Sequence, residues 1–377
     1  MACSEPRVSR SLNDGPDRMT RTLDGDDIEA LAVGAWILGT GGGGNPYPGL
    51  LNMRQAYEAG IRVRLVDIDA IDDGAQIATV ASQGAPIVGQ ERMKDPQVIA
   101  QSVKALEDYL GASFSMLMSL EVGGGNAFFP LMAASILGYP VVDADWMGRA
   151  YPELQMTGLC VGDLRPYPLA TVDPRGIEAI VSKAPSWKWL EDVSRKICTS
   201  FGSTASICLP PCSGRDAKAW GIPHTISTAI RIGTAVRQAR RGNHDPVEAI
   251  LAETCGRLLF RGTVMDVDRK PTDGFLRGVV KIRGTEDFLS QTLAIDFQNE
   301  WLLARVDGEP AAMSPDLICV IDEVNGEAIG TETIRYGQRV VAVVLPPPEV
   351  FRSAEGLRLV GPAAFGYPIE YRSVFES

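Results

Sequence analysis

The sequence contains very little histidine, with only His224 and His244 among its 377 residues. A site built from several histidines is therefore excluded, and few partners remain for a Ser-His-Asp or Cys-His catalytic arrangement. Each histidine is expected at the surface or beside the start of a helix. The seven cysteines are odd in number and irregularly spaced, which favours reduced thiols and a cytoplasmic location over a disulfide framework.

A long apolar run and an excess of positive charge are also missing. No segment has the apolar length needed to span a bilayer, and residues 1–20 lack the apolar core of a secretory signal. The net charge of −11 argues against nucleic-acid binding, because phosphate contacts need clustered lysine and arginine. We therefore expect no membrane and no nucleic-acid partner, and a disordered lead-in at residues 1–20. Formation of a homo-oligomer is left open.

Residues 21–256 alternate between helical and strand patterns. Apolar residues recur at helical spacing in residues 26–37 and 96–111, whereas "AQIATVAS", "SMLMSLEV" and "YPVVDAD" have the apolar character of buried strands. This alternation predicts an α/β domain with a partly parallel sheet.

The pattern changes after residue 256. Short β-rich segments separated by turn residues run from "RLLFRGTVMDVDRK" through "QRVVAVVLP" to "LRLVGP" at 357–362. They predict a mostly β domain at 257–377, built as a small barrel or a sandwich. The fold class is therefore α+β, with an N-terminal α/β domain followed by a mostly β domain.

A glycine-rich loop occurs twice, in "GGGGNPYPGLLNM" (41–53) and "VGGGNAFFPLMAA" (122–134). Each copy precedes a helical segment, whose first backbone N–H groups have no partner inside the helix. Glycine lets a ligand approach these groups. The alternative is that both loops are tight helix connections whose glycines only permit close packing. The candidate binding residues are Gly42, Gly43, Gly44, Asn45, Gly124, Gly125 and Asn126.

Neither loop has the features of a phosphate site. The first loop lacks the G-K-[ST] ending and follows a helical segment, so the nucleotide fingerprints do not fit. The second loop follows a strand that ends at Glu121, whose negative charge would repel phosphate. A donor-rich loop beside a carboxylate instead suits a neutral polar ligand with both N–H and C=O groups, such as a cyclic amide.

Charged residues are dense in "VVDADWMGRAYPELQM" (141–156), where Asp143, Asp145 and Arg149 follow an apolar strand. Ligands of α/β sheets collect at the carboxyl ends of strands. Two neighbouring carboxylates can divide the roles of acid and base, or hold a metal ion. Arg149 can neutralise one of them, and a salt-bridged structural turn explains any single one of these residues equally well.

Several long motifs resemble the S-methyl-thiohydantoin desulfurase family over about Asp24 to Tyr371. The resemblance implies hydrolysis of an S-methylated thiohydantoin to a hydantoin and methanethiol, or action on a related five-membered cyclic imide or amide. Because family members often occur beside or fused to hydantoinase and oxoprolinase subunits, it also implies a protein partner of that type. The motifs are "LGTGGGGNPYPG", "APIVGQER", "EVGGGNAFFPL", "PVVDADWMGRAYPELQM", "DFQNEWLLA", "PDLICVID", "RYGQRV" and "GPAAFGY".

His224 departs from the small residue expected at its position from this resemblance, which leaves the exact substrate open. For the implied reaction, Asp143 or Asp145 is the predicted base, while Glu121 acts as the acid or binds a ring N–H. The two loops would donate hydrogen bonds to the ring carbonyl. Cys160 is an alternative nucleophile, although no histidine or lysine near it in sequence would activate it.

Three further side chains are predicted to contact the substrate, namely Arg149, Gln83 and Asn299. No cofactor is predicted with certainty. Two other mechanisms remain open at this point. One is a metal-dependent cyclic amidohydrolase, with an oxygen-ligated divalent ion held by Asp143, Asp145 and Glu121. The other is a non-catalytic subunit that serves as the scaffold of a hydantoinase-type enzyme.

Overall fold

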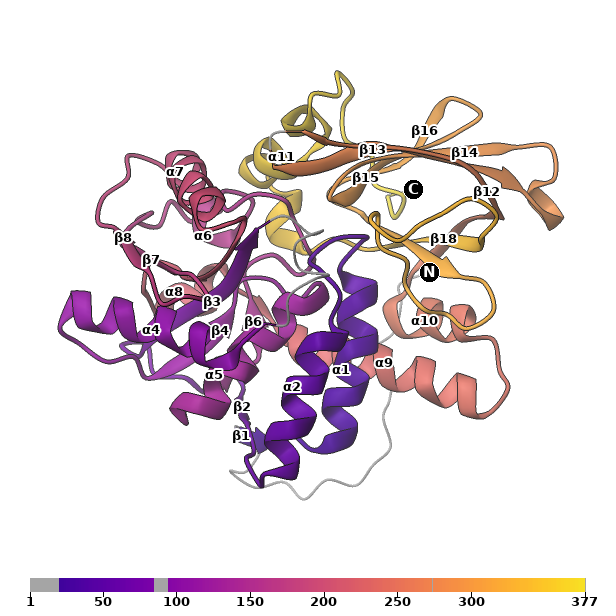
Figure 1. Ribbon diagram of the computed structural model, residues 1–377. Helices are drawn as coiled ribbons and strands as arrows, with labels where there is room; N and C mark the ends of the chain where they lie inside the picture. The colour runs from indigo at the N-terminus through magenta and orange to yellow at the C-terminus, as the bar shows by residue number, and fades with distance from the viewer. Residues whose placement is uncertain (1–19, 85–93, 273, 377) are drawn as a thin grey trace.

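The computed structural model describes residues 20–84, 94–272 and 274–376, which form two β-sheets with helices between and around them (Figure 1). The first sheet has the strand order β1-β2-β5-β4-β3-β9-β7-β8, with β10 beside β3. The second has the order β16-β15-β14-β13-β12-β18-β17. The predicted fold class, α+β with a mostly β second part, is confirmed.

The first sheet is mixed, as its sequence pattern predicts. The pairs β2/β5, β4/β5 and β3/β4 are parallel, whereas β1, β7, β8, β9 and β10 pair antiparallel. Its strands are β1 (Thr20–Thr22), β2 (Arg64–Val66), β3 (Gln76–Gly84), β4 (Met116–Ser119), β5 (Val141–Val142), β7 (Leu169–Val172), β8 (Glu178–Val181), β9 (Thr204–Cys208) and β10 (Cys212–Ser213). A separate two-stranded ribbon joins β6 (Ala144–Asp145) to β11 (Ile222–Pro223).

The helices cover both faces of the first sheet. Alternate residues of β3 contribute to opposite cores: Ala78 and Val80 to the core that holds α1, α4 and α5, and Ile77 and Ala81 to the core that holds α7. This alternation follows from the two-residue period of a strand. The helices are α1 (Gly25–Leu38), α2 (Tyr47–Glu58), α4 (Pro96–Leu110), α5 (Phe129–Leu137), α6 (Gly158–Val161), α7 (Trp187–Ser200), α8 (Gly214–Trp220), α9 (Thr225–Arg241), α10 (Pro246–Thr254) and α11 (Ala354–Val360).

Side-chain caps fix where several helices begin. Asp24 and Asp27 form a capping box at α1, and the Asp95 carboxylate caps α4, which has Pro96 at its first position. Short 3₁₀ segments connect other elements: η2 (Ile68–Ala70), η3 (Gly124–Phe128), η4 (Glu286–Phe288), η5 (Glu349–Arg352) and η6 (Pro362–Phe365). No helix in the described ranges combines the length and the apolar character needed to cross a bilayer.

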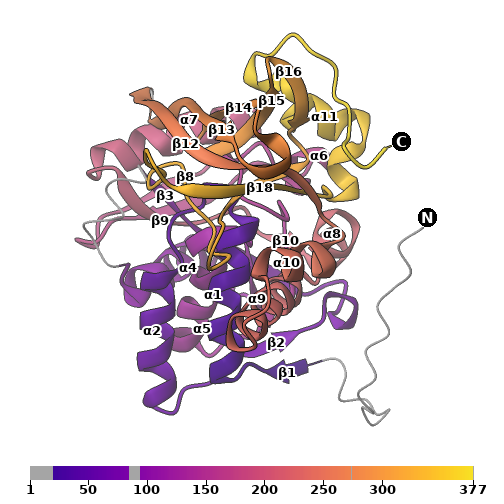
Figure 2. The same cartoon turned by 90° about the vertical axis from the view of Figure 1, so that its right-hand side faces the viewer.

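The second sheet is antiparallel and curls into a half-barrel. Its edge strands β16 and β17 do not pair among the described residues, so it is neither the closed barrel nor the sandwich that the sequence predicts. One face of β17 packs on α1, and the same face of the sheet at β18 packs on α10 (Figure 2). The strands are β12 (Arg257–Thr272), β13 (Phe275–Gly284), β14 (Thr292–Gln298), β15 (Glu300–Val306), β16 (Glu309–Met313), β17 (Leu317–Asp322) and β18 (Arg339–Leu345).

Two local predictions differ from the structure. The predicted strand at 357–362 is wrong, because Ala354–Val360 form α11. Ser353 caps this helix by accepting a hydrogen bond from the Gly356 N–H at 3.0 Å, and a short apolar run cannot by itself distinguish a strand from a helix. Thr20, the last residue of the predicted disordered lead-in, instead begins β1. Residues 1–19 lie outside the described part of the chain.

Candidate active site

The two glycine-rich loops lie against each other. The Gly125 N–H donates to the carbonyl oxygens of Gly43 at 3.0 Å and Gly44 at 2.8 Å. Gly43 has a φ of +71°, and a Cβ atom there would lie 2.3 Å from the Gly123 carbonyl oxygen. Only glycine avoids both the left-handed strain and this overlap. The repeated sequence therefore builds one joint between the start of α2 and the start of α5.

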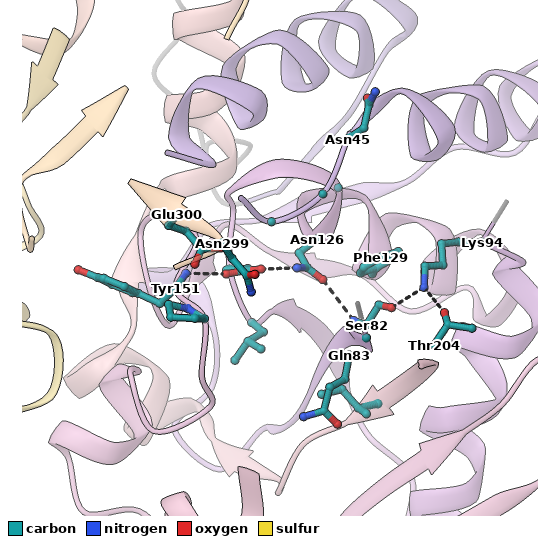
Figure 3. Close-up of a pocket in the computed structure, with 18 of the residues that line it drawn as sticks. Asn45, Ser82, Gln83, Lys94, Asn126, Phe129, Tyr151, Thr204, Asn299 and Glu300 are labelled. Carbon is teal, nitrogen blue, oxygen red and sulfur yellow. Dashed lines mark hydrogen bonds between the residues drawn. The ribbon is translucent and has the colours of Figure 1, made fainter. Parts of the chain in front are cut away.

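A cavity of about 470 Å³ opens where this joint faces the end of β3 and the turn between β14 and β15 (Figure 3). Its size falls within the range of small-molecule sites. Most of the residues predicted to form a site line it: Gly43, Gly44, Asn45, Gln83, Glu121, Gly125, Asn126 and Asn299. The structure thus brings together side chains from both sheets.

The loop N–H groups are used differently from the prediction. Those of Gly42 and Gly125 donate to backbone carbonyls, and that of Gly43 hydrogen-bonds the Glu300 carboxylate. Gly42 and Gly124 do not belong to the described lining of the cavity. Close packing explains these two glycines, because a Cβ at Gly42 would lie 1.9 Å from Glu300 Oε1 and a Cβ at Gly124 would lie 2.5 Å from the Gly44 carbonyl oxygen.

The two loop asparagines also serve the protein itself. Asn45 Oδ1 accepts a hydrogen bond from the Tyr47 N–H at 2.8 Å, and its side chain lies apart from the other labelled residues in Figure 3. Asn126 Oδ1 accepts from the Ser82 N–H at 3.2 Å, while its Nδ2 donates to Glu121. The role of Asn126 is therefore to orient the Glu121 carboxylate.

Two buried glutamates meet at the cavity. Glu121 follows β4 and its Oε2 accepts from the Tyr151 N–H at 3.1 Å, while Glu300 begins β15. Burial raises the pKa of Glu300 to about 8. Burial, followed by repulsion from Glu300, raises the pKa of Glu121 well above its usual range. Such a carboxylate pair can exchange protons with a ligand near neutral pH.

Glu300 was missed by the sequence analysis, although it directly follows Asn299 in "DFQNEW". Its Oε2 is buried and finds no hydrogen-bond partner among the described residues. Asn299 lies in the turn between β14 and β15 with a φ of +58°. This conformation sets the position of the Glu300 side chain. The turn is fixed because Asn299 Oδ1 accepts from the Leu276 N–H at 2.9 Å. Asparagine tolerates this left-handed conformation better than most residues.

Lys94 is a second residue that the sequence analysis missed. Its Nζ donates to Ser82 Oγ at 2.8 Å and to Thr204 Oγ1 at 2.6 Å. Within the described part of the chain it makes no ion pair, and burial lowers its pKa to about 8. A line of hydrogen bonds thus runs along the cavity from Glu121 through Asn126 and Ser82 to Lys94 (Figure 3).

Gln83 lies beside this line and holds α7. Its Nε2 contacts Glu191 Oε2 at 3.3 Å and Ser194 Oγ at 3.2 Å. Its Oε1 is buried and has no partner among the residues that the structure describes. Gln83 can therefore accept a hydrogen bond from a ligand N–H.

Asp143 and Asp145 do not reach this cavity, contrary to their predicted role as base. The strand does not continue through them, because β5 ends at Val142 and β6 pairs with β11 instead. Asp145 is fully buried and accepts from the N–H groups of Val122 at 2.6 Å and Gly148 at 2.8 Å. Burial raises its pKa to about 8. Asp143 instead lines a second cavity.

Arg149 neither pairs with these carboxylates nor lines the active-site cavity. It is fully buried between the two sheets, where it donates to Thr40 Oγ1 at 2.6 Å and to the Asp316 carbonyl at 3.1 Å. It also donates to the Trp301 carbonyl at 3.3 Å. Arg149 therefore fixes the first glycine loop to the half-barrel, and its place outside the cavity lining gives no support to the predicted contact with the substrate.

We expect Arg149→Lys to lower the free energy of unfolding by about 2–4 kcal/mol, because at least two buried carbonyls lose their donors. Urea unfolding of both proteins measures the difference. Arg283→Lys is the control, since Arg283 is exposed and its change should stay within about 0.5 kcal/mol. Equal losses in the two variants would show that Arg149 does not hold the sheets together.

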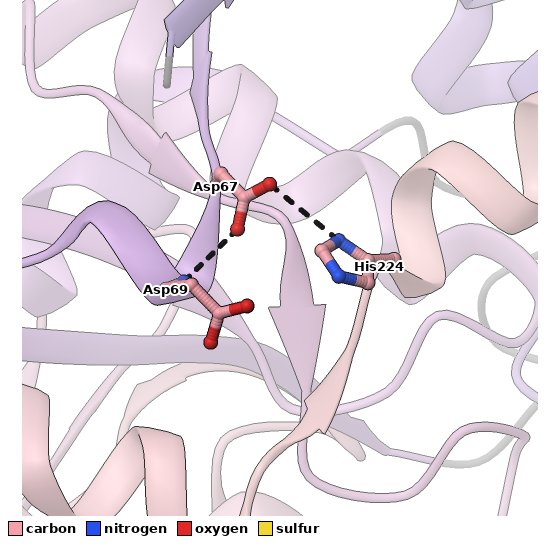
Figure 4. Close-up of side chains that lie close together, drawn as sticks. All are labelled: Asp67, Asp69 and His224. Atoms are coloured by element: carbon pink, nitrogen blue, oxygen red, sulfur yellow. Dashed lines mark hydrogen bonds and ion pairs between the residues drawn. The ribbon is translucent and has the colours of Figure 1, made fainter. Parts of the chain in front are cut away.

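The other predicted chemistries find no support in this geometry. Cys160 lies outside the cavity, and burial raises the pKa of its thiol to about 11, which makes it a poor nucleophile. Asp143, Asp145 and Glu121 do not form a metal-binding group; in the described ranges the one group with suitable spacing is Asp67, Asp69 and His224 (Figure 4). The motif "APIVGQER" falls on residues 85–92, outside the described residues.

The raised pKa of Glu300 predicts a pH-dependent stability. Its pKa is about 8 in the fold against 4.5 for an ordinary glutamate, so the protonated form favours folding. The contribution of this proton to the free energy of unfolding is fully present below pH 4.5, and it is lost as the pH rises from 4.5 through about 8. We expect the unfolding free energy of the wild type to fall relative to Glu300→Gln by up to about 1.4 kcal/mol per pH unit within this window. Urea unfolding at several pH values tests this, and a constant difference would refute it.

Sequence and structure comparisons agree with this architecture. Residues 26–183 match the S-Me-THD-like N-terminal domain, and residues 185–374 match the S-Me-THD-like C-terminal domain. A crystal structure of a protein from Chromobacterium violaceum is 23% identical with a TM-score of 0.78, over 94% of this chain and 100% of that chain. At this identity the likeness concerns the fold alone. No curated protein matches significantly. The predicted domain limits, 21–256 and 257–377, stay predictions.

Proposed function

The chain belongs to the S-Me-THD-like family, and from that premise we propose that it hydrolyses an S-methylated thiohydantoin or a closely related cyclic amide. The observation that carries the proposal is the buried pair of Glu121 and Glu300 in one cavity of heterocycle size. Hydrolysis of a thioether-bearing amidine carbon needs a base for water and an acid for the ring nitrogen. Two carboxylates with raised pKa values meet both needs.

The environments of the two glutamates suggest how the roles divide. Glu121 accepts hydrogen bonds from the Tyr151 N–H and from Asn126, and both donors favour its charged form. Glu300 has one oxygen without a partner among the described residues and a pKa of about 8. In the proposed reaction Glu121 is the base and Glu300, protonated at neutral pH, is the acid.

The proposed steps balance in atoms and charge. Glu121 takes one proton from water as the water oxygen bonds to the ring carbon, and Glu300 gives its proton to the adjacent ring nitrogen. The carbon–sulfur bond then breaks as the new hydroxyl becomes a carbonyl. The hydroxyl proton returns to Glu300, and Glu121 passes its proton to the departing thiolate. The products are a hydantoin and methanethiol, and both carboxyl groups recover their starting forms.

Other polar groups of the cavity would hold the ring. The Lys94 ammonium suits a ring carbonyl oxygen, and the free Gln83 Oε1 suits a ring N–H. Backbone carbonyls engage the N–H groups of Gly42 and Gly125, and in this proposal the Gly43 N–H positions Glu300. The Lys94 donor and the Gln83 acceptor together match a planar ring with alternating C=O and N–H groups.

The proposal is tested by incubating the full chain with an S-methyl-thiohydantoin and measuring methanethiol with a thiol reagent. Hydantoin should appear in equal amount, and heat-denatured protein serves as the blank. A second assay replaces the substrate with a hydantoin, which has no S-methyl group, and measures opening of the ring. The two assays together separate thioether hydrolysis from cyclic amide hydrolysis. Absence of turnover with both compounds would contradict a hydrolytic role for this cavity.

A further inference from the structure

One wall of the active-site cavity is apolar and takes no part in the proton transfers. Its side chains are Leu120, Met147, Leu154 and Ile207. All four belong to the core that holds α7, and none is more than 5% exposed. We propose that this apolar wall receives the S-alkyl group of the substrate and that Met147 limits the size of that group. The inference rests on the proposed function and specifies which thioethers the site accepts.

The apolar wall begins directly beside the predicted base. Leu120 precedes Glu121 in the chain, and both line the cavity. The Trp146 N–H donates to the Leu120 carbonyl at 3.1 Å, and the Tyr151 N–H donates to Glu121 Oε2 at 3.1 Å. Met147 lies between these two anchored residues, so its segment is held against the end of β4. A substrate carbon that faces Glu121 therefore has an apolar surface within reach.

The substituents of the reacting carbon decide which of them meets this surface. The carbon carries two ring nitrogens and one sulfur. In the proposed reaction Glu300 protonates one of the nitrogens, so the ring side of the carbon needs polar partners. A thioether sulfur accepts hydrogen bonds only weakly, and its methyl group is stabilised by leaving water. The polarizable thioether of Met147 is suited to contact with such a group.

An apolar environment also favours release of the sulfur as a neutral thiol. When the carbon–sulfur bond breaks, its electron pair goes to sulfur. A thiolate without polar neighbours is disfavoured, since burial penalises the charged form. In the proposed reaction the proton held by Glu121 passes to this sulfur, and Leu120 is the next residue along the chain. The wall therefore favours this proton transfer over escape of a free thiolate.

The apolar wall has little room to yield to a larger group. Ile207 lies on β9, which is paired with β3, and the Leu154 N–H donates to the Glu191 carboxylate at 3.2 Å. Met147 is only 1% exposed. One added methylene in an apolar pocket changes kcat/KM by roughly 10–200-fold. We therefore expect the S-methyl compound to be preferred over the S-ethyl compound by about tenfold or more.

The test is a competition between the S-methyl and the S-ethyl thiohydantoin in one reaction. Gas chromatography of methanethiol and ethanethiol gives the ratio of the two kcat/KM values. Met147→Ala should reduce the preference for the S-methyl compound about tenfold, because the shorter side chain leaves space for the second carbon. Both thiols come from the same enzyme molecules, so the ratio does not depend on the fraction of protein that is folded.

A second methionine supplies the matched control. Met156 belongs to the same core and is 2% exposed, but it is not part of the described lining of the cavity. Met156→Ala removes the same atoms from the same core and should keep the wild-type preference. If Met147→Ala fails to fold, Leu120→Ala replaces it. Its control is Leu159→Ala, since Leu159 also belongs to this core outside the described lining.

Binding measurements distinguish this inference from the proposed reaction. Calorimetry in a Glu300→Gln background gives the Kd of each thioether without the proposed acid. A size preference that Met147→Ala weakens and Met156→Ala keeps would support the apolar wall, even if the wild type released no thiol. Thiol release with no size preference, or with the same preference in both variants, would overturn the inference and leave the reaction standing. Failure of both thioethers to bind would overturn both.

Discussion

Glu300→Gln is expected to lower kcat for methanethiol release by about 10²–10⁴-fold, the usual contribution of a general acid. Glutamine keeps the shape of the side chain but cannot donate a carboxyl proton to the ring nitrogen. Because Glu300 lines the cavity and its pKa is about 8, the wild type holds this proton at neutral pH. KM should change far less than kcat, since the lost interaction arises mainly in the transition state.

A matched control separates lost chemistry from a disturbed fold. Glu107 is also a buried glutamate, but it lies outside the cavity and accepts hydrogen bonds from Tyr139 and the Phe114 N–H. Glu107→Gln should therefore keep its kcat per folded molecule even if its stability falls. A Glu300→Gln protein with wild-type kcat would remove Glu300 from the mechanism.

Gly43→Ala should separate the two glycine loops and lower the free energy of unfolding by more than about 3 kcal/mol. The new methyl group would meet the Gly123 carbonyl oxygen at 2.3 Å, at a φ of +71°. The left-handed conformation alone costs roughly 1–2 kcal/mol for a residue with a side chain, and the overlap with rigid backbone adds the remainder. Because Gly43 also hydrogen-bonds Glu300, activity should fall with it.

The neighbouring residue provides the comparison for this variant. Gly44 has a φ of +78°, but a Cβ there would meet nothing within 4 Å. Gly44→Ala therefore introduces the conformational strain without the overlap, and its loss of stability should stay near about 1–2 kcal/mol. Urea unfolding of both variants gives the two values. Equal losses would mean that the loops do not need their close approach.

Local sequence signals predicted much of the fold. Apolar residues at helical spacing in residues 26–37 and 96–111 predicted α1 and α4, and short apolar runs predicted most of the strands. The prediction failed at α11, where a short apolar run carries no clear period. It also failed for the closure of the second sheet, because pairing between distant strands depends on curvature that no local pattern encodes.

The candidate site was only partly visible in the sequence. The repeat of the two glycine loops suggested related roles, but only the structure shows that the loops lie against each other. Glu300 comes from the other sheet and Lys94 from the start of α4, and only the three-dimensional arrangement brings them to Glu121. Asp143 and Asp145 were misplaced because the sequence suggests one continuous strand where the chain turns between β5 and β6. The hydantoinase-type protein partner stays a prediction.

The most direct test of the central claim is a crystal structure of Glu300→Gln bound to an S-methyl-thiohydantoin. The proposal predicts the ring in the cavity beside the joined glycine loops, with the thioether carbon facing Glu121 and a ring nitrogen within hydrogen-bond distance of the side chain at position 300. A ring bound in the cavity beside Asp143 and His224, or anywhere away from Glu121, would contradict the claim that this carboxylate pair performs the reaction.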